Sequence, residues 1–269
     1  MKPDRNGAAS GERLHKVLAR AGLGSRRQIE DWIRAGRVRV NDQQAVLGQS
    51  VTGADRLVVD GQAVVLAAPA KARLMLYHKP EGEVCTRRDP EGRPTVFDRL
   101  PPLPGGRWIS VGRLDINSSG LLLLTTDGNL AHRLMHPGNH QEREYAVRVR
   151  GQVDQAMLDR LRGGVELEDG PARFLTITAA GGAGLNQWFH VIVDEGRNRL
   201  VRRLWASQGI TVSRLLRVRY GPLALPRALA RGQWREATAQ ELAAVSERPA
   251  TPRRSANRRL ETRARPRLR

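Results

Sequence analysis

The stretch at residues 108–128 sets two short apolar runs on either side of a polar turn. The first run, at 108–111, ends at a glycine, and the second contains four consecutive leucines before an Asp-Gly pair. Runs of this length are typical of buried strands, and no apolar run in the sequence approaches the roughly 18 residues that a membrane span needs. The sequence therefore predicts a folded domain built around a sheet, with the polar turn exposed at a strand end.

The region at 73–247 interleaves short strand-forming runs with helical stretches. We expect strands at 74–77, 108–111, 145–149 and 188–193, and helices at 129–135, 154–161, 200–208 and 239–245. The spacing is not that of regular β-α-β units, and Asp-Gly turns favour hairpins between neighbouring strands. The predicted fold class is α+β, with a mostly antiparallel sheet and flanking helices.

A smaller basic unit is predicted at 12–68. Apolar residues at positions 14, 17, 18 and 21 lie on one helix face, and Ser25 with Gln28 has the spacing of a capping box that starts a second helix. Valine pairs on either side of the Asp60-Gly61 turn predict a small sheet after the helices. The Ala- and Pro-rich stretch at 67–73 has no periodicity and indicates a linker between the two units.

Net charge gives the first indication of a partner. Lys and Arg exceed Asp and Glu by 19, and residues 246–269, with nine Arg and two Glu, account for only +7 of this excess. A folded part that still carries +12 favours a polyanion such as RNA or DNA as its partner. The Arg- and Pro-rich tail at 248–269 is predicted to be disordered.

Other features bear on location and metals. Cys85 is the single cysteine, and the N-terminal stretch lacks the apolar segment of a signal peptide, so we expect a soluble cytoplasmic protein with no membrane partner. His132 and His136 have the spacing of a zinc-binding helix, but Arg133 stands where a glutamate is required, so no metal site is expected. We also expect the protein to act as a monomer.

The polar turn carries the strongest candidate for chemistry. Asp115 follows Gly112-Arg113-Leu114 and precedes the sequence Asn-Ser-Ser-Gly at 117–120. A carboxylate at a strand end, with flexible backbone around it, is open to a substrate. An Asp in such a sequence is also common as an Asx-turn residue that caps its own loop. The spacing alone leaves both interpretations open.

A series of segments resembles the RsuA/RluB family of rRNA pseudouridine synthases. GRLD at 112–115 with GLLLLTTDG at 120–128 is similar to the family signature, and KPEGEVCTRRDPEGRPTVFDRLP at 79–101, RLMHP at 133–137, EREYAVRV at 142–149 and EGRNRLVRRLWASQG at 195–209 follow in the family's order. GSRRQIEDWIRAGRVRVN at 24–41 resembles an S4 RNA-binding domain, which precedes the catalytic domain in this family. The similarity covers about residues 12–245, and the longer segments favour the large-subunit branch of the family.

The resemblance implies an activity and its residues. The family breaks the N1–C1′ bond of a uridine, turns the uracil over and joins C5 to C1′, with neither cofactor nor metal. Asp115 would be the catalytic carboxylate, acting as a nucleophile at C1′ or as a base at C2′, and these two roles stay open. Arg202 would hold it charged and oriented, and Tyr145 would stack on a uridine flipped out of its helix.

The resemblance also implies how RNA is held. Ribosomal RNA, most simply the 23S rRNA in a precursor of the large subunit, would be the partner. The arginines expected to bind it are Arg26, Arg27, Arg34 and Arg37 in the N-terminal unit and Arg113, Arg197, Arg199 and Arg203 beside the active site. The alternative for the first four is a solvated helix face that binds nothing.

Three other functions fit part of the sequence. A non-catalytic S4-type ribosome assembly factor would need the RNA-binding unit but not Asp115, Tyr145 and Arg202 together. A synthase that modifies the 16S rRNA of the small subunit would share the same catalytic residues. A basic ribosomal protein would match the charge but not the second domain of about 175 residues.

Overall fold

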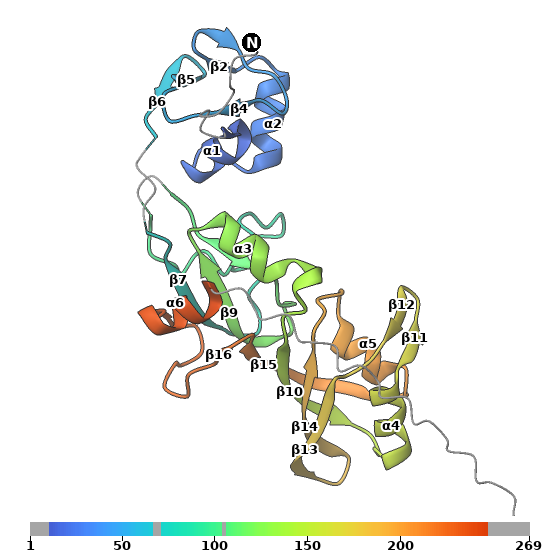
Figure 1. Ribbon diagram of the computed structural model, residues 1–269. Helices are drawn as coiled ribbons and strands as arrows, with labels where there is room; N and C mark the ends of the chain where they lie inside the picture. Colours follow the sequence, from blue (N-terminus) through green and yellow to red (C-terminus); the bar gives the residue numbers. More distant parts are fainter. Residues whose placement is uncertain (1–10, 67–70, 104–105, 247–269) are drawn as a thin grey trace, which may run out of the picture.

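The computed structural model describes residues 11–66, 71–103 and 106–246 (Figure 1). The tail predicted to be disordered and most of the predicted linker lie outside these described residues. None of the described helices is both long enough and apolar enough to cross a membrane.

The N-terminal unit has two short helices and a small sheet. The elements are β1 (Glu12–Arg13), α1 (Leu14–Arg20), α2 (Arg26–Arg34), β2 (Val38–Val40), β3 (Gln43–Gln44), β4 (Ser50–Val51), β5 (Leu57–Val59) and β6 (Gln62–Val64). The predicted capping box is present, since Ser25 accepts a hydrogen bond from the Gln28 amide and Gln28 accepts one from the Ser25 amide. The strands pair in the order β3-β2-β5-β6, and a buried cluster between helices and sheet includes Leu18, Ile29 and Leu57.

The larger unit is built on a nine-stranded sheet, which confirms the predicted α+β class. The main path of the sheet runs β13-β14-β10-β15-β9-β7-β17, with β8 paired to β9 and β16 to β15. Every pair is antiparallel except β15 with β9. The strands are β7 (Leu74–Lys79), β8 (Ile109–Val111), β9 (Ser119–Thr125), β10 (Arg143–Arg150), β13 (Thr176–Ala183), β14 (Asn186–Val193), β15 (Thr211–Tyr220), β16 (Leu223–Ala224) and β17 (Trp234–Glu236).

Helices and one hairpin cover the ends of this sheet (Figure 1). The helices are α3 (Gly128–Met135), α4 (Gln155–Gly163), α5 (Leu200–Ala206) and α6 (Ala239–Ser246), with the short turn η1 (Pro137–Asn139), and the hairpin is β11 (Val165–Leu167) with β12 (Gly170–Ala172). Figure 1 shows α3 and α6 near β7 and β9, whereas α4 and α5 lie near β10, β13 and β14. Each group buries its own apolar cluster, and Trp205 and Phe189 belong to the second of them.

The centre of the sheet is where β15 and β9 meet. Gly120 of β9 opposes Arg217 of β15, and a Cβ added at Gly120 would overlap the Arg217 backbone. Gly120 also has a φ of +109°, a conformation that side chains rarely adopt. The glycine therefore lets two halves of the sheet join directly beside the loop that carries Asp115.

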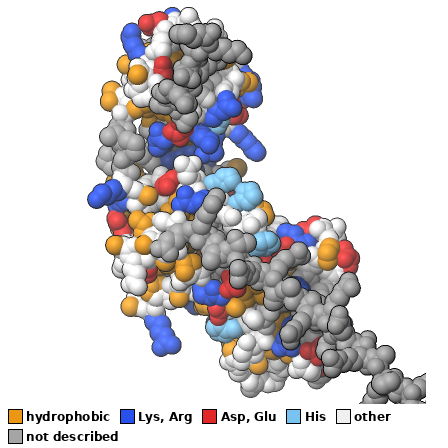
Figure 2. Space-filling view, viewed as in Figure 1, with side chains coloured by type: hydrophobic (Ala, Val, Ile, Leu, Met, Phe, Trp, Pro, Cys, Tyr) orange, Lys and Arg blue, Asp and Glu red, His pale blue; other side chains and the backbone are white. Residues whose placement is uncertain are grey.

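The two units contact each other through arginines. Arg107 donates to the Gly24 carbonyl oxygen at 2.8 Å. Burial lowers the pKa of Arg107, and repulsion by Arg87 and Arg26 lowers it further. Figure 2 shows Lys and Arg side chains gathered where the N-terminal unit meets the larger one. Positive charge is therefore concentrated at the junction of the units.

Candidate active site

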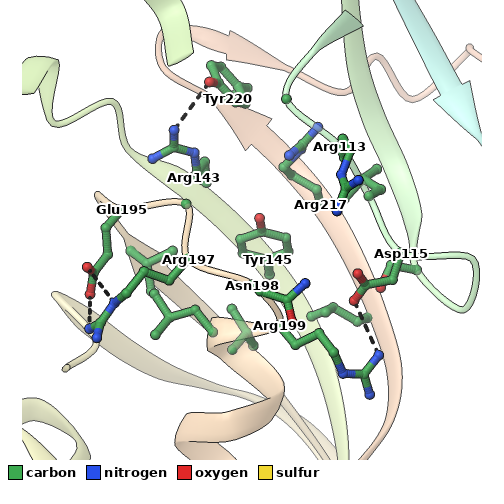
Figure 3. Close-up of a pocket in the computed structure, with 18 of the residues that line it drawn as sticks. Arg113, Asp115, Arg143, Tyr145, Glu195, Arg197, Asn198, Arg199, Arg217 and Tyr220 are labelled. Carbon is green, nitrogen blue, oxygen red and sulfur yellow. Dashed lines mark hydrogen bonds and ion pairs between the residues drawn. The ribbon is translucent and has the colours of Figure 1, made fainter. Parts of the chain in front are cut away.

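A cavity of about 330 Å³ lies between the two halves of the sheet (Figure 3). Its walls come from the loop at 112–118 before β9, from β10, from β15 and from the loop at 195–199 before α5. Four segments that are separate in the sequence thus meet around one pocket. Asp115, Tyr145 and Arg199 all line it.

Asp115 lies on the turn that joins β8 to β9. The carbonyl oxygen of Asp115 accepts from the Ser118 amide at 3.0 Å, so the residue does form a tight turn, as one of the two interpretations of the sequence expects. Its side chain nevertheless faces the pocket and is 29% exposed. The two interpretations are therefore compatible, because the backbone closes the turn while the carboxylate faces the cavity.

A buried lysine stabilises this turn through hydrogen bonds to its backbone. Lys79, at the end of β7, is fully buried, and its Nζ donates to the carbonyl oxygens of Pro80, Asp115 and Ser118 at 2.9, 3.2 and 2.9 Å. Burial lowers the pKa of Lys79, and the charges of Cys85, Glu83 and Asp115 partly oppose this. The three bonds fix the backbone from which the Asp115 carboxylate projects.

The cation that lies beside Asp115 is Arg199. Its Nη1 is 3.6 Å from Asp115 Oδ2, and its side chain is 50% exposed at the mouth of the pocket. Arg199 has a φ of +49° at the N-terminus of α5, so the chain turns sharply as it presents this side chain. The sequence predicted Arg199 as a contact to RNA and Arg202 as the counter-ion.

Arg202 instead contacts the backbone behind Asp115. It donates from Nη2 to the Asn117 carbonyl oxygen at 2.8 Å and from Nη1 to the Val212 carbonyl oxygen at 3.0 Å. Burial lowers its pKa, repulsion from Arg199 adds to this, and the Asp115 charge opposes it. Because its two terminal nitrogens bind these carbonyl oxygens, the direct ion pair expected of Arg202 belongs to Arg199 in this structure. Arg202 still interacts electrostatically with Asp115, and its hydrogen bond to Asn117 holds the loop that carries Asp115.

Tyr145 lies at the centre of the pocket in Figure 3. It comes from β10, where it opposes Val191 of β14 and Arg217 of β15, and it packs against two of the apolar clusters. Its ring is half-buried, with one part in the core and the other lining the cavity. An aromatic ring held this way offers a flat surface for a base.

The sequence did not single out three residues at the upper end of the pocket in Figure 3, namely Arg143, Arg217 and Tyr220. Both arginines are buried, with 8% and 2% of their surface exposed, and both guanidinium carbons lie about 5 Å from the centre of the Tyr220 ring. Charged residues in strands usually face solvent. The sequence of β10 and β15 therefore gives no sign that these two arginines are buried. Once the strand register is known, Arg143 and Arg217 are seen to occupy positions at which apolar side chains are expected, but the sequence alone does not provide that register.

The other arginines predicted to bind RNA differ in their surroundings. Arg113 is exposed and lines the pocket. Arg197 and Arg203 both pair with Asp169 of the β11–β12 turn, and Arg197 also pairs with Glu195. In the N-terminal unit, Arg34 pairs with Asp31 and Arg37 with Asp60, whereas Arg26 and Arg27 are exposed, and no ion pair of theirs is found among the described residues.

The histidine pair that the sequence set aside lies outside the pocket. His132 on α3 and His136, which directly follows the helix, are exposed and stack with ring centres 5.3 Å apart. Over the described ranges, no group of three or more His, Cys, Asp or Glu side chains is placed to hold a metal ion.

Comparison with known proteins identifies the family. The profile of the RNA pseudouridylate synthase family matches residues 73–207, and that of the S4 domain matches residues 12–57. The first match covers half of the chain and includes Asp115, Tyr145 and Arg202. The chain therefore belongs to the RNA pseudouridylate synthase family, with an S4 domain at its N-terminal side.

Individual relatives agree with this assignment. The chain is 58% identical over 248 residues to a Pseudomonas aeruginosa protein named ribosomal large subunit pseudouridine synthase B, over 91% of this chain and 64% of that protein. The protein of the same name from Escherichia coli K12 is 60% identical over 229 residues, covering 84% of this chain and 79% of the relative. The chain thus spans slightly less than two thirds of the Pseudomonas protein's length.

A solved structure supports the fold. The crystal structure of a pseudouridylate synthase aligns with a TM-score of 0.61 at 27% identity, over 87% of this chain and 99% of that chain. The predicted family and fold are therefore confirmed.

Proposed function

We propose that this chain isomerises a uridine of large-subunit ribosomal RNA to pseudouridine, with Asp115 as the catalytic carboxylate. The observation that carries the proposal is the placement of Asp115, Arg199 and Tyr145 around one pocket between the halves of the sheet. The large-subunit names of the similar proteins support 23S rRNA as the substrate. Within that rRNA, we propose uridine 2605 as the target, on the resemblance of the sequence to the large-subunit branch of the family.

The proposed isomerisation moves the attachment of C1′ on the uracil from N1 to C5. The C1′–N1 bond breaks with its electron pair on the uracil, the ring turns over, C5 bonds to C1′, and the C5 proton is replaced by a proton on N1. Asp115 serves either as nucleophile at C1′ or as base at C2′, and both roles require an ionised carboxylate. The Arg199 guanidinium, 3.6 Å away, places a positive charge beside this carboxylate.

Access to C1′ requires the uridine to leave its stack. Flipping a base out costs a few kcal/mol, which contacts between the enzyme and the RNA must offset. The half-buried Tyr145 ring supports stacking of the flipped uracil, and the exposed Arg113 at the pocket supports contact with the backbone around it. We extend the proposal to rRNA in a precursor of the large subunit, bound by a monomer of the enzyme.

Tritium release tests the reaction directly. A 23S rRNA transcript carrying 5-tritiated uridine loses tritium to water only when C5 becomes bonded to C1′. We expect release by the wild-type chain and a loss of at least 10³-fold in Asp115→Asn, because a carboxylate that acts as nucleophile or base is replaced by an amide of the same shape. The matched control is Asp159→Asn, which removes an exposed carboxylate on α4 outside the pocket.

The alternatives give different results in the same assay. Release by neither protein on 23S or 16S rRNA, with RNA still bound, would replace the proposal by the non-catalytic assembly factor. Release from 16S rRNA alone would keep Asp115 as catalyst and move the substrate to the small subunit.

A further inference from the structure

Arg217 is a buried cation at the pocket that the proposed roles of Asp115, Tyr145 and Arg199 do not use. It projects from β15 and is 2% exposed, and its Nε donates to the Leu121 carbonyl oxygen at 2.7 Å. Its Nη2 is also buried, and no hydrogen-bond partner for this nitrogen exists among the described residues. A buried guanidinium with an unused donor is costly unless something else satisfies it.

No carboxylate neutralises Arg217 in the described part of the chain. Its positive neighbour Arg143 is also buried and, among the described residues, donates to the Gln141 carbonyl oxygen and the Tyr220 hydroxyl but forms no ion pair. Both guanidinium groups lie against the Tyr220 ring, at 5.1 and 5.2 Å from its centre. Buried charges are normally paired, so two unpaired guanidinium groups at one end of a pocket indicate a ligand that carries or develops negative charge.

The geometry around Arg217 is rigid. The Tyr220 hydroxyl donates to the Leu134 carbonyl oxygen at 2.7 Å and accepts from Arg143 Nη2 at 3.3 Å, which fixes the ring. The ring and the Leu121 carbonyl oxygen together fix the Arg217 guanidinium. A cation positioned before the substrate arrives stabilises charge without having to reorganise, which is the most effective form of electrostatic catalysis.

The position of Arg217 deep in the pocket indicates which part of the substrate it contacts. Phosphates of an RNA chain stay near solvent, at the mouth, where Arg199 is half exposed and Arg113 is exposed. A flipped uracil enters further, against Tyr145, and β-strand pairing places Arg217 opposite Tyr145. Uracil offers two carbonyl oxygens, O2 and O4, as hydrogen-bond acceptors.

We propose that Arg217 binds a carbonyl oxygen of the flipped uracil and stabilises the uracil anion that forms when the C1′–N1 bond breaks. The electron pair of that bond goes to N1, and the negative charge spreads to O2 and O4. The charge disappears when C5 bonds to C1′ and N1 takes up a proton. Arg217 keeps its own proton throughout, because a guanidinium does not deprotonate in proteins, so it acts by charge alone.

This inference rests on the proposed uridine isomerisation, and chemical rescue separates the two. Arg217→Ala should bind 23S rRNA with wild-type affinity but lose about 10²–10³-fold in single-turnover tritium release, the usual effect of removing one preorganised donor. Added guanidinium ion, well below unfolding concentrations, should restore part of this rate. Urea, which is neutral and of the same shape, should not.

Two further variants control for folding and for charge in general. Arg217→Gln keeps an N–H near the Leu121 carbonyl oxygen, so it should fold while showing the same loss of rate. Arg214→Ala removes an exposed arginine from the same strand and should leave the single-turnover rate unchanged.

Three results would overturn the role of Arg217. They are a normal rate in both Arg217 variants, equal rescue by guanidinium and urea, and a loss of RNA affinity with a normal rate at saturation, which would indicate a phosphate contact. No tritium release by the wild-type chain would be a different failure, that of the proposed function itself.

Discussion

Arg199 and Arg202 lie one helical turn apart at the start of α5, yet they act on Asp115 in different ways. The exposed Arg199 forms the direct ion pair, and the less exposed Arg202 binds the carbonyl oxygens of Asn117 and Val212. A motif fixes the order of residues but not which side chain of a helical turn reaches the carboxylate. Which arginine reaches the carboxylate depends on the left-handed backbone conformation of Arg199, and the sequence pattern does not predict that conformation.

Mutations of the two arginines should therefore have different effects on the reaction rate and on the free energy of unfolding. Arg199→Gln should lower the single-turnover rate by about 5- to 10-fold with little effect on stability, because a half-exposed ion pair contributes about 1 kcal/mol. Arg202→Gln should lower the rate and also the free energy of unfolding, by about 2 kcal/mol, because it breaks charged hydrogen bonds to two carbonyl oxygens. Tritium release and urea unfolding measure the two effects. Equal losses of stability in both variants would contradict this division of roles.

The sequence predicted the centre of the site better than its wall. Asp115 and Tyr145 stand in segments whose similarity to the family is high, and the structure places both on one pocket. Arg143 and Arg217 could not be predicted, because buried arginines in strands break the alternation from which strands are recognised. Their positions follow only from the pairing of β10 with β15.

At the scale of elements, the most central of the strands that the sequence did not predict is β15. This strand is the longest in the sheet and occupies its centre, but its sequence, TVSRLLRVRY, carries three arginines among its apolar residues. Elements with strong periodicity were predicted within a few residues, as for α3, α4 and β14. β15 was missed because its arginines are held by tertiary contacts, which local patterns do not contain.

Helix α6 gives a test of an element's attachment. Glu241 of α6 accepts from both terminal nitrogens of Arg235 at 2.7 and 2.6 Å and from the Thr238 amide at 2.8 Å. The Arg235 hydrogen bonds lower the pKa of Glu241 to about 2. Since the folded-state pKa lies below the unfolded one, this stabilisation is full above about pH 4.5 and is lost as the pH falls toward 2.

Glu241→Gln should therefore destabilise the chain in a pH-dependent way. We expect a loss of about 1–2 kcal/mol in the free energy of unfolding at neutral pH, after allowance for solvent screening of a pair that is partly exposed. The difference from wild type should shrink below pH 4 and vanish near pH 2, as urea titrations at several pH values would show. Glu166→Gln, on the exposed edge of β11, serves as the control. A difference that does not change with pH would contradict the ion pair as its origin.

At the scale of the whole molecule, some of the described arginines are paired with carboxylates and others are not. Arg34 and Arg37 of the N-terminal unit are paired with carboxylates, and Arg26 lies near Arg87 and Arg107 at the junction with the larger unit. The number of charges and the division into two units could be predicted from the sequence. The sequence could not distinguish free from paired arginines, because the partner Asp60 lies 23 residues from Arg37.

This difference should appear in the salt dependence of RNA binding. Replacing both Arg26 and Arg27 by Gln should weaken rRNA binding and lower the log–log salt slope by about 1.5, since each phosphate contact contributes about 0.7–0.9. The same replacement at Arg34 and Arg37 should have a smaller effect, because carboxylates already neutralise them. Filter binding across a salt series measures both. Equal effects of the two double variants would show that the ion pairs do not matter for RNA.

The central claim, that Asp115 isomerises a uridine of large-subunit rRNA, is tested most directly by mapping pseudouridines in the rRNA of a strain that lacks the gene. We predict that one pseudouridine of 23S rRNA is missing from that strain, that the wild-type chain restores it, and that Asp115→Asn does not. Restoration by Asp115→Asn, or a missing site in 16S rRNA instead, would contradict the account.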